Sequence, residues 1–351
     1  MRIAGERSRK ITDRSLTLLA AGAVLAFLWL ARELLIPVTL GIFLAAAVSP
    51  IVIRLERLRV PHALSALAGT LLTSVVVAGI VAVLYNGVAA FAQELPAYED
   101  RIRAALKVIA SHVTHLARQG ETFVTPPPGA VKVQQGLPWG SVLVGTAQGA
   151  LALAAQATVA GFTLYFALAE GPRYREKLLM ALRRDPAARQ RALTVFGEIH
   201  HDIEQYMVNR LLLNAALGAV LWCLYAAYGL EHAAVWALGT ALLHFIPYVG
   251  PAVGLVPPTL MAVLQYGTVK DVSIVAGIYI VLVSLQGNFV DPIFLGKQLR
   301  LSSIAVFLGS LFWFWIWGPV GLFLAVPLLS SIRAGCRHFP PAKVVADLLG
   351  E

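Results

Sequence analysis

Long apolar windows without charged side chains alternate along this chain with short basic or mixed-charge segments. A helix that crosses a bilayer needs about 20 predominantly apolar residues, and windows of that length recur from end to end. The pattern therefore predicts an all-α, polytopic helical membrane protein with about eight membrane segments. The predicted segments are residues 15–31, 34–53, 63–92, 141–169, 207–228, 233–269, 272–290 and 301–332.

Composition supports a membrane protein rather than a large soluble core. The chain has 351 residues, of which 58% are hydrophobic and 13% are charged, whereas a soluble domain carries about 25% charged residues. A formal net charge of +9 is typical of basic cytoplasmic loops in membrane proteins, so we predict no nucleic-acid binding. Cys223 and Cys336 show no disulfide or metal-ligand spacing, and we expect neither a metal nor a cofactor.

Charged segments divide the chain into distinct parts. Residues 93–139 combine charges with apolar positions at near-helical spacing and end in a proline-rich linker, which indicates a small amphipathic domain outside the membrane core. The predicted parts are N-terminal spans in 1–92, this extracytoplasmic segment in 93–139, a fourth span with a basic cytoplasmic helix in 140–206, a core with two broken windows in 207–332, and a cytoplasmic tail in 333–351.

Basic residues set the predicted orientation. Lys and Arg are enriched in short cytoplasmic loops, and here they gather in residues 2–14, 54–59 and 173–191. If each of the first windows crosses the membrane once, these stretches fall on one side. Both termini are then cytoplasmic, and residues 93–139 face the outside.

Two related breaks interrupt the apolar C-terminal half, at residues 250–257 and 318–327. Each reads Gly-Pro, then Val, then Gly-Leu, then Val-Pro. Proline and glycine end helices and free backbone groups that lipid cannot satisfy, so such breaks lie buried in protein or line a watery cavity. Paired breaks in two corresponding halves are typical of the binding sites of secondary transporters. Two proline-kinked helices without a ligand are the simpler interpretation.

The broken windows allow two topologies. Each window either crosses once, giving about eight spans, or returns to its own side as a re-entrant hairpin, giving about six spans and two hairpins. The second version makes residues 207–269 and 272–332 two span-plus-hairpin units of opposite orientation, as in inverted-repeat transporters. The pattern of apolar residues leaves both topologies open.

Motifs around the breaks resemble one family of bacterial permeases. Residues 244–251, His-Phe-Ile-Pro-Tyr-Val-Gly-Pro, look like the signature of the autoinducer-2 exporter-like family, also called PerM-type permeases. Residues 288–297 and the second break match its C-terminal pattern, and the resemblance covers nearly the whole chain. Family members often carry Asn at the place of His244, and many carry an acidic residue where this chain has residues 286–288. The absence of that acidic residue weakens the case for cation coupling at this position. The resemblance implies an inner-membrane permease that exports a small polar signalling molecule or exchanges a monovalent cation for protons.

Polar side chains within apolar segments are costly in lipid and usually functional. The two breaks are expected to meet near the bilayer midplane, with Asn214 and Arg210 on the cytoplasmic approach. The side chains expected to reach the cavity between the breaks are those of His244, Tyr248, Asn288 and Asp291. Of these we expect His244 or Asp291 to carry any proton coupling. A buried hydrogen-bonding His244, a capping Asp291 and an Arg210 that reaches the interface are the simpler interpretations. The predicted substrate or ion path comprises His244, Pro247, Tyr248, Gly250, Pro251, Asn288, Asp291, Gly318, Pro319, Asn214 and Arg210.

Two further expectations concern residues in and beside the breaks. Gly250 and Gly318 each precede a proline, and a tight backbone path there is expected to require glycine. Trp313, Trp315 and Trp317 are expected to anchor the chain at the membrane interface.

Two classes of function fit this pattern. The repeated breaks favour a secondary transporter whose partners are the lipid bilayer and a small polar solute, a monovalent cation or protons. The alternative is a non-transporting membrane scaffold or assembly partner that uses residues 93–139 and 173–205. A homo-oligomer is compatible with both. The chain has no phosphate-cradling Gly-x-x-x-x-Gly-Lys-Ser/Thr loop and no nucleophile–base constellation, so we predict neither a primary pump nor an enzyme.

The predicted orientation can be tested with a cysteine placed at Ser111, within the segment that is expected to face the outside. We expect a membrane-impermeant thiol reagent to label Ser111→Cys in intact cells, because the flanking basic stretches are expected in the cytoplasm. Labelling that occurs only after permeabilisation would contradict this topology.

Overall fold

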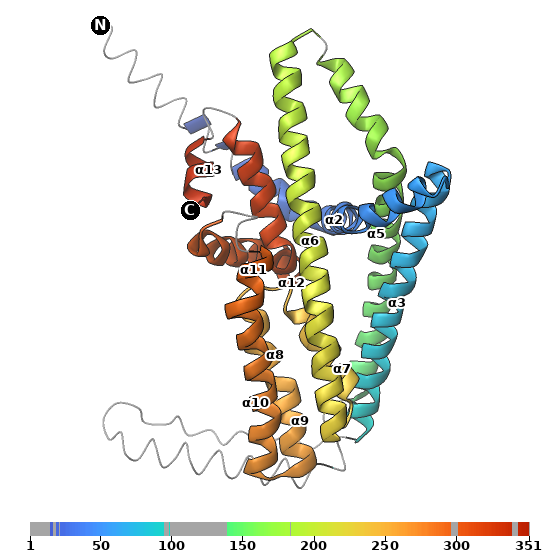
Figure 1. The fold of residues 1–351 in the computed structure, drawn as a ribbon, viewed down its shortest axis with the longest axis vertical. Helices are drawn as coiled ribbons and strands as arrows, with labels where there is room; N and C mark the ends of the chain where they lie inside the picture. The colour runs from blue at the N-terminus through green and yellow to red at the C-terminus, as the bar shows by residue number, and fades with distance from the viewer. Residues whose placement is uncertain are drawn as a thin grey trace, which may run out of the picture. The chain divides into compact units, whose positions relative to one another are not determined.

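The computed structural model describes residues 15–16, 19–20, 22–94, 98, 139–182, 184–295, 301–338 and 343–350. These residues are almost entirely helical (Figure 1), and their only bridge of the β type joins Leu301 to Gly350. The predicted all-α membrane fold is confirmed. Most of the predicted extracytoplasmic segment, residues 93–139, lies outside the described residues.

The long helices come from the charge-free windows of the sequence. Within the described ranges, six helical stretches are long and apolar enough to cross a membrane: Arg32–Arg57, His62–Glu94, Pro186–Tyr228, Val249–Tyr266, Val269–Phe294 and Ser303–Arg337. The helices in chain order are α2 (Arg32–Arg57), α3 (His62–Glu94), α5 (Trp139–Ala181), α6 (Pro186–Tyr228), α7 (Ala233–Leu243), α8 (Val249–Gly254), α9 (Val256–Tyr266), α10 (Val269–Leu285), the π-helix η2 (Gln286–Val290), α11 (Asp291–Leu295), α12 (Ser303–Arg337) and α13 (Lys343–Leu349).

The chain divides into two compact units that interleave along the sequence. Unit 1 comprises Met1–Ser74, Gln156–Arg210 and Leu295–Glu351, and unit 2 comprises Val75–Ala155 and Leu211–Phe294. Helices α3, α5 and α6 each continue from one unit into the other. The first break therefore belongs to unit 2 and the second to unit 1.

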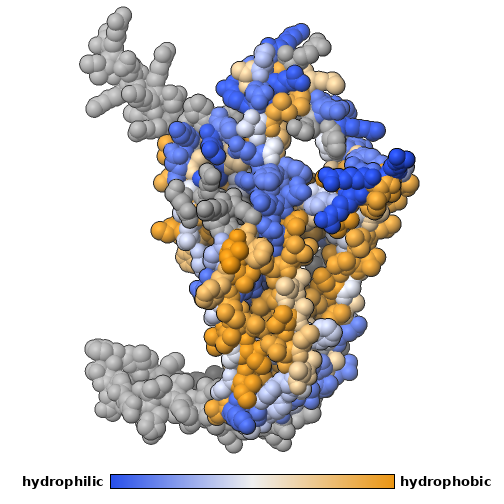
Figure 2. Space-filling view, in the orientation of Figure 1, coloured by the Kyte–Doolittle hydropathy of each residue, from blue (hydrophilic) through white to orange (hydrophobic). Residues whose placement is uncertain are grey.

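Helices α5 and α6 are longer than a bilayer requires. Each has 43 residues, which corresponds to about 65 Å of helix, roughly twice the thickness of the hydrocarbon core. The basic stretch at residues 173–191 forms the end of α5 and the beginning of α6 rather than a separate helix. Figure 2 shows polar residues gathered at this end of the two helices.

The first broken window folds as a hairpin. Helix α7 ends at Leu243, residues 244–248 form a turn, and α8 and α9 lead the chain back. The Gln265 side chain donates a hydrogen bond to the carbonyl of Gly229 at 2.8 Å and accepts one from the amide of Glu231 at 2.9 Å. These bonds bring the end of α9 to the beginning of α7, so the window starts and finishes at the same place.

The second broken window also folds back on itself. Gly318 interrupts α12 with φ 63° and ψ −147°, far from helical values. A Cβ atom at Gly309 would lie 2.5 Å from the side chain of Leu329, although residues this far apart on one straight helix are separated by about 30 Å. The two halves of α12 therefore pack against each other across the break.

Two of the three tryptophans that were expected to anchor the chain at the membrane interface are buried instead. Trp313 and Trp317 are buried in the core of unit 1 with their rings 4.9 Å apart, and only Trp315 is exposed. The indole N–H of Trp317 donates to the carbonyl of Leu28 at 3.1 Å. The second hairpin thus uses these aromatic rings for packing close to its tip.

Glycine is required at both breaks, for different physical reasons. A Cβ at Gly250 would lie 2.0 Å from the carbonyl oxygen of Leu243, whereas the backbone of Gly318 occupies a region that is essentially restricted to glycine. We expect Gly250→Ala and Gly318→Ala each to lower the free energy of unfolding by about 1–3 kcal/mol. The measurement is the thermal unfolding midpoint of the purified protein in detergent.

Two other glycines provide matched controls. Gly239 on α7 and Gly335 on α12 are helical, and a Cβ at either would meet nothing within 4 Å. Gly239→Ala and Gly335→Ala are expected to leave the midpoint unchanged or to raise it, because alanine favours a helix over glycine by up to about 1 kcal/mol. Losses of equal size in all four variants would contradict the special role of the breaks.

Candidate functional site

A row of buried polar side chains lines the inner faces of α6, α7 and α10 in unit 2. Each of these side chains is at most 6% exposed, although the parts of the helices around them are mostly apolar. Polar groups are seldom buried in such helices without a structural or functional use. The members of this polar row are Asn214, Tyr225, Thr240, His244, Tyr279 and Gln286.

Helical spacing explains why each helix presents its polar residues on one face. Thr240 on α7 and His244, the residue that caps α7, are one turn apart, and Tyr279 on α10 and Gln286, the first residue of η2, are two turns apart. On α6, the small residue Gly218 lies one turn from Asn214, and a Cβ there would lie only 2.9 Å from the Cβ of Ala241. Helix α7 therefore lies directly against α6 beside Asn214.

Hydrogen bonds at two levels join α6 to α10 and to η2, which continues α10. The Gln286 amide donates to Oδ1 of Asn214 at 3.3 Å, in a buried setting. Further along the same two helices, the Tyr228 hydroxyl donates to Oδ1 of Asp271 at 2.6 Å. The two bonds show that α6 and α10 run side by side in antiparallel directions.

Tyr279 connects α10 to the returning arm of the first hairpin. Its hydroxyl donates to the carbonyl of Pro251 at 2.8 Å, and its ring meets His244 edge-on with the centroids 6.1 Å apart. Gly254 makes room for this contact, since a Cβ there would lie 2.5 Å from the Tyr279 hydroxyl. Tyr225 is close enough to Tyr279 for the two hydroxyls to interact electrostatically.

The hydrogen bond of His244 defines which ring nitrogen carries a proton. Its Nδ1 lies 2.9 Å from the carbonyl oxygen of Thr240. Because a carbonyl can only accept, Nδ1 is the donor, and Nε2 of the neutral imidazole is then an acceptor. His244 thus turns an acceptor toward the interior of unit 2.

Several polar atoms of the row have no hydrogen-bond partner within the described part of the chain. They are Asn214 Nδ2, Tyr225 Oη, Thr240 Oγ1 and Gln286 Oε1. Leaving such a buried group unsatisfied costs about 1–3 kcal/mol. The set contains donors and acceptors, and no member of the row is an Asp, Glu, Lys or Arg. This arrangement suits a small uncharged solute that carries hydroxyl or carbonyl groups.

A π-turn sets the position of Gln286. The amide of Asp291 bonds to the carbonyl of Gln286, which is the i→i+5 pattern of a π-helix, and such turns are frequent at functional sites. Gln286 points into the polar row, while Asn288 is exposed and donates to the carbonyl of Ser284 at 2.9 Å. The predicted path residue Asn288 therefore lies outside the row.

The other predicted path residues fall into three groups. Asn214 and His244 belong to the polar row, and the carbonyl of Pro251 borders it. Pro247 and Tyr248 lie in the hairpin tip, where the Tyr248 side chain is 51% exposed, and Gly250 lies in the first turn of α8. Asp291 is half-buried at the start of α11. Arg210, which is buried, and Gly318 and Pro319 belong to unit 1. The meeting of the two breaks stays a prediction.

Sequence reasoning missed half of the polar row. Thr240, Tyr225 and Tyr279 were hidden because threonine and tyrosine are ordinary within apolar helices. One signal was available for Thr240, which precedes His244 by four residues and so shares its face. Gln286 was noticed only as a departure from an acidic residue of the family pattern.

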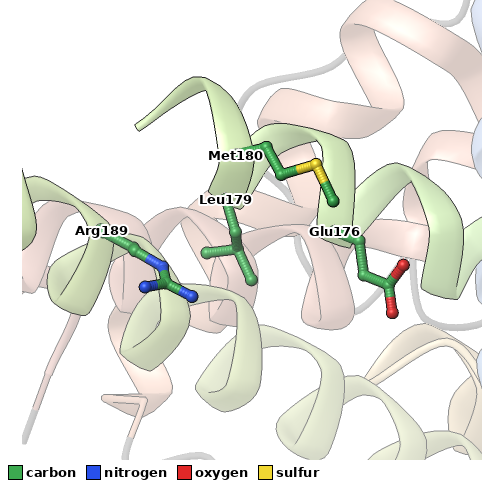
Figure 3. A pocket seen from close by; sticks show the side chains of 4 residues that line it. All are labelled: Glu176, Leu179, Met180 and Arg189. Atoms are coloured by element: carbon green, nitrogen blue, oxygen red, sulfur yellow. The ribbon is translucent and has the colours of Figure 1, made fainter. Parts of the chain in front are cut away.

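A surface hollow elsewhere in the chain does not compete with this site. It lies between the end of α5 and the beginning of α6, and it is lined by Glu176, Leu179 and Met180 from α5 and by Arg189 from α6 (Figure 3). Both charged side chains are exposed. The hollow also belongs to the basic stretch rather than to an apolar segment, so it offers no buried polar group to a solute.

Comparison with known proteins agrees with a transport role. A family model described as AI-2E family transporter matches residues 18–340. AI-2 transport protein TqsA of Escherichia coli is 26% identical over 331 residues, which cover 92% of this chain and 90% of TqsA. A Haemophilus influenzae protein named for transport is 26% identical over 342 residues, covering 95% and 96% of the two chains. The E. coli protein PerM, named as a permease, is 23% identical over 200 residues, covering 57% and 56%.

The two buried tyrosines of the polar row are expected to differ in their contribution to stability. Tyr279→Phe removes the hydroxyl that satisfies the Pro251 carbonyl, and we expect the free energy of unfolding to fall by about 1 kcal/mol. Tyr225→Phe removes a buried hydroxyl that has no partner among the described residues, so it should leave the free energy of unfolding unchanged or raise it. Thermal unfolding of both variants in the same detergent measures the difference, and equal losses would contradict it.

Proposed function

The chain belongs to the AI-2E transporter family, and we propose that it carries a small, uncharged polar solute across the bacterial inner membrane along the polar row of unit 2. The family match supports transport, and the name of the relative TqsA gives AI-2 as the first solute to test. The observation that carries the proposal is the set of buried donors and acceptors without partners in the described residues.

Charge supports an uncharged solute over a bare cation. Divalent cations are usually bound by several oxygen ligands that include carboxylates, and the polar row contains none. Among the residues of the predicted path, Asp291, which is half-buried just after the π-helix, is the carboxylate that could serve exchange of a monovalent cation. Export of a small polar solute is therefore the first candidate, and exchange of a cation is the second.

The dimensions of the first hairpin support a re-entrant position. Helix α7 has 11 residues, which corresponds to about 16 Å, or roughly half of the hydrocarbon core. If its base lies at the outer surface, the tip at residues 244–248 reaches about the bilayer midplane. In this proposal both termini are cytoplasmic, and the second hairpin enters from the opposite side.

Transport by purified protein in sealed vesicles tests the proposal. We expect wild-type protein to move AI-2 faster than protein-free vesicles do. Tyr225→Phe should raise the apparent KM about 3–10-fold, which is the loss of one hydrogen bond, and it should not lower the thermal midpoint. A higher KM without a lower thermal midpoint would show that Tyr225→Phe loses a contact with the solute and does not impair folding.

A matched tyrosine serves as the control. Tyr85 on α3 is 68% exposed, so Tyr85→Phe should leave both KM and the midpoint unchanged. Equal KM values for wild type and Tyr225→Phe would contradict the proposal that the solute passes along the polar row. Wild-type rates equal to those of empty vesicles would contradict AI-2 transport and favour the scaffold alternative.

A further inference from the structure

The end of α3 is fastened to the base of the first hairpin by two polar contacts. Nε2 of His232 lies 2.8 Å from Oε2 of Glu94, which makes an ion pair when the imidazole is protonated. The Tyr98 hydroxyl donates to Oε2 of Glu231 at 2.5 Å. The two contacts join Glu94, the last residue of α3, and Tyr98, four residues later, to the turn between α6 and α7, within unit 2.

Apolar packing holds the same two elements together. The Phe91 ring meets His232 edge-on with the centroids 6.2 Å apart, and it meets Trp236 edge-on at 5.3 Å. One turn earlier, a Cβ at Gly87 would lie 2.0 Å from a methyl group of Val235. The last turns of α3 therefore lie directly on the first turn of α7.

The turn that receives these contacts is also the base of the hairpin. Glu231 donates its amide to Gln265 on the returning arm, and the Trp236 indole donates to the carbonyl of Glu231 at 3.0 Å. His232 itself has a φ of 55°, which is uncommon for a residue other than glycine. Glu94 and His232 therefore meet at a turn that is bonded to both arms of the hairpin.

We propose that Glu94 and His232 form a pH-sensitive clasp between α3 and the base of the first hairpin. Histidine changes its charge between about pH 5 and 8, while carboxylates ordinarily keep theirs. A hydrogen bond between two charged groups is roughly twice as strong as one between neutral groups. The clasp therefore tightens as the pH falls and loosens as it rises.

The other groups that face His232 are one carboxylate and several uncharged side chains. Glu231 is the neighbouring charged residue on the turn, and its carboxylate accepts the hydrogen bond of Tyr98. The packed side chains from α3, α7 and α9 are Phe91, Trp236 and Gln265, which carry no charge. In the next turn, Asp271 is already engaged by Tyr228 and Thr268. The inference does not depend on the identity of the solute.

Hydrogen–deuterium exchange of the purified full-length protein tests the clasp. Amides of residues 87–94 are compared at about pH 5.5 and about pH 8, after correction for the intrinsic chemical rate. We expect exchange to be several-fold slower at the lower pH in the wild type. His232→Asn should abolish this difference, and asparagine tolerates the left-handed backbone conformation at this position. Glu94→Gln should abolish it as well.

Two controls separate the clasp from general effects. His62→Gln removes a comparable histidine–glutamate pair, in which Nδ1 of His62 lies 2.6 Å from Oε1 of Glu56 in unit 1, and it should keep the pH response of residues 87–94. Tyr98→Phe removes the contact that does not titrate in this range, so it should speed exchange equally at both pH values. A pH response that survives in both His232→Asn and Glu94→Gln, or disappears equally in His62→Gln, would overturn the proposal.

Discussion

Backbone groups that leave a helix inside a membrane must be shielded from lipid, and both hairpins of this chain depend on meeting that requirement. Each does so by bringing backbone against backbone at its tip. A Cβ at Gly250 would lie 2.0 Å from the carbonyl oxygen of Leu243, and one at Gly321 would lie 2.1 Å from that of Trp313. The similar motifs therefore produce similar close packing in two separate units.

The close packing of the first hairpin also determines what surrounds its tip. The two arms pack closely because no side chain fits between them at Gly250. As a result, the His244 ring and the Pro251 carbonyl both lie against Tyr279 of α10. Tyr279 satisfies that carbonyl, and beyond it Asn214 and Gln286 extend the polar row. A neutral row of this kind can hydrogen-bond a solute without the large desolvation cost that a buried charge would add.

The first hairpin is held by polar contacts at both of its ends. Its tip is held by Tyr279, and its base is held by Gln265 and by the Glu94–His232 contact. The contact at the tip is a neutral hydrogen bond in the interior, whereas the contact at the base includes a titratable pair on a partly exposed surface. In the two proposals the ends have different roles, since the tip borders the solute path and the base carries the pH-sensitive clasp.

The sequence by itself determined the all-α class, the apolar segments, the positions of both breaks and the family. Those properties are local, because hydrophobic windows and Gly-Pro pairs act on the residues next to them. Tertiary structure decided that both broken windows fold back and that Trp313 and Trp317 are buried. It also paired Asn214 with Gln286 across 72 residues and turned Asn288, in the middle of the π-helix, outward. These outcomes depend on which helix faces meet, and the spacing of residues within one helix does not specify its neighbours.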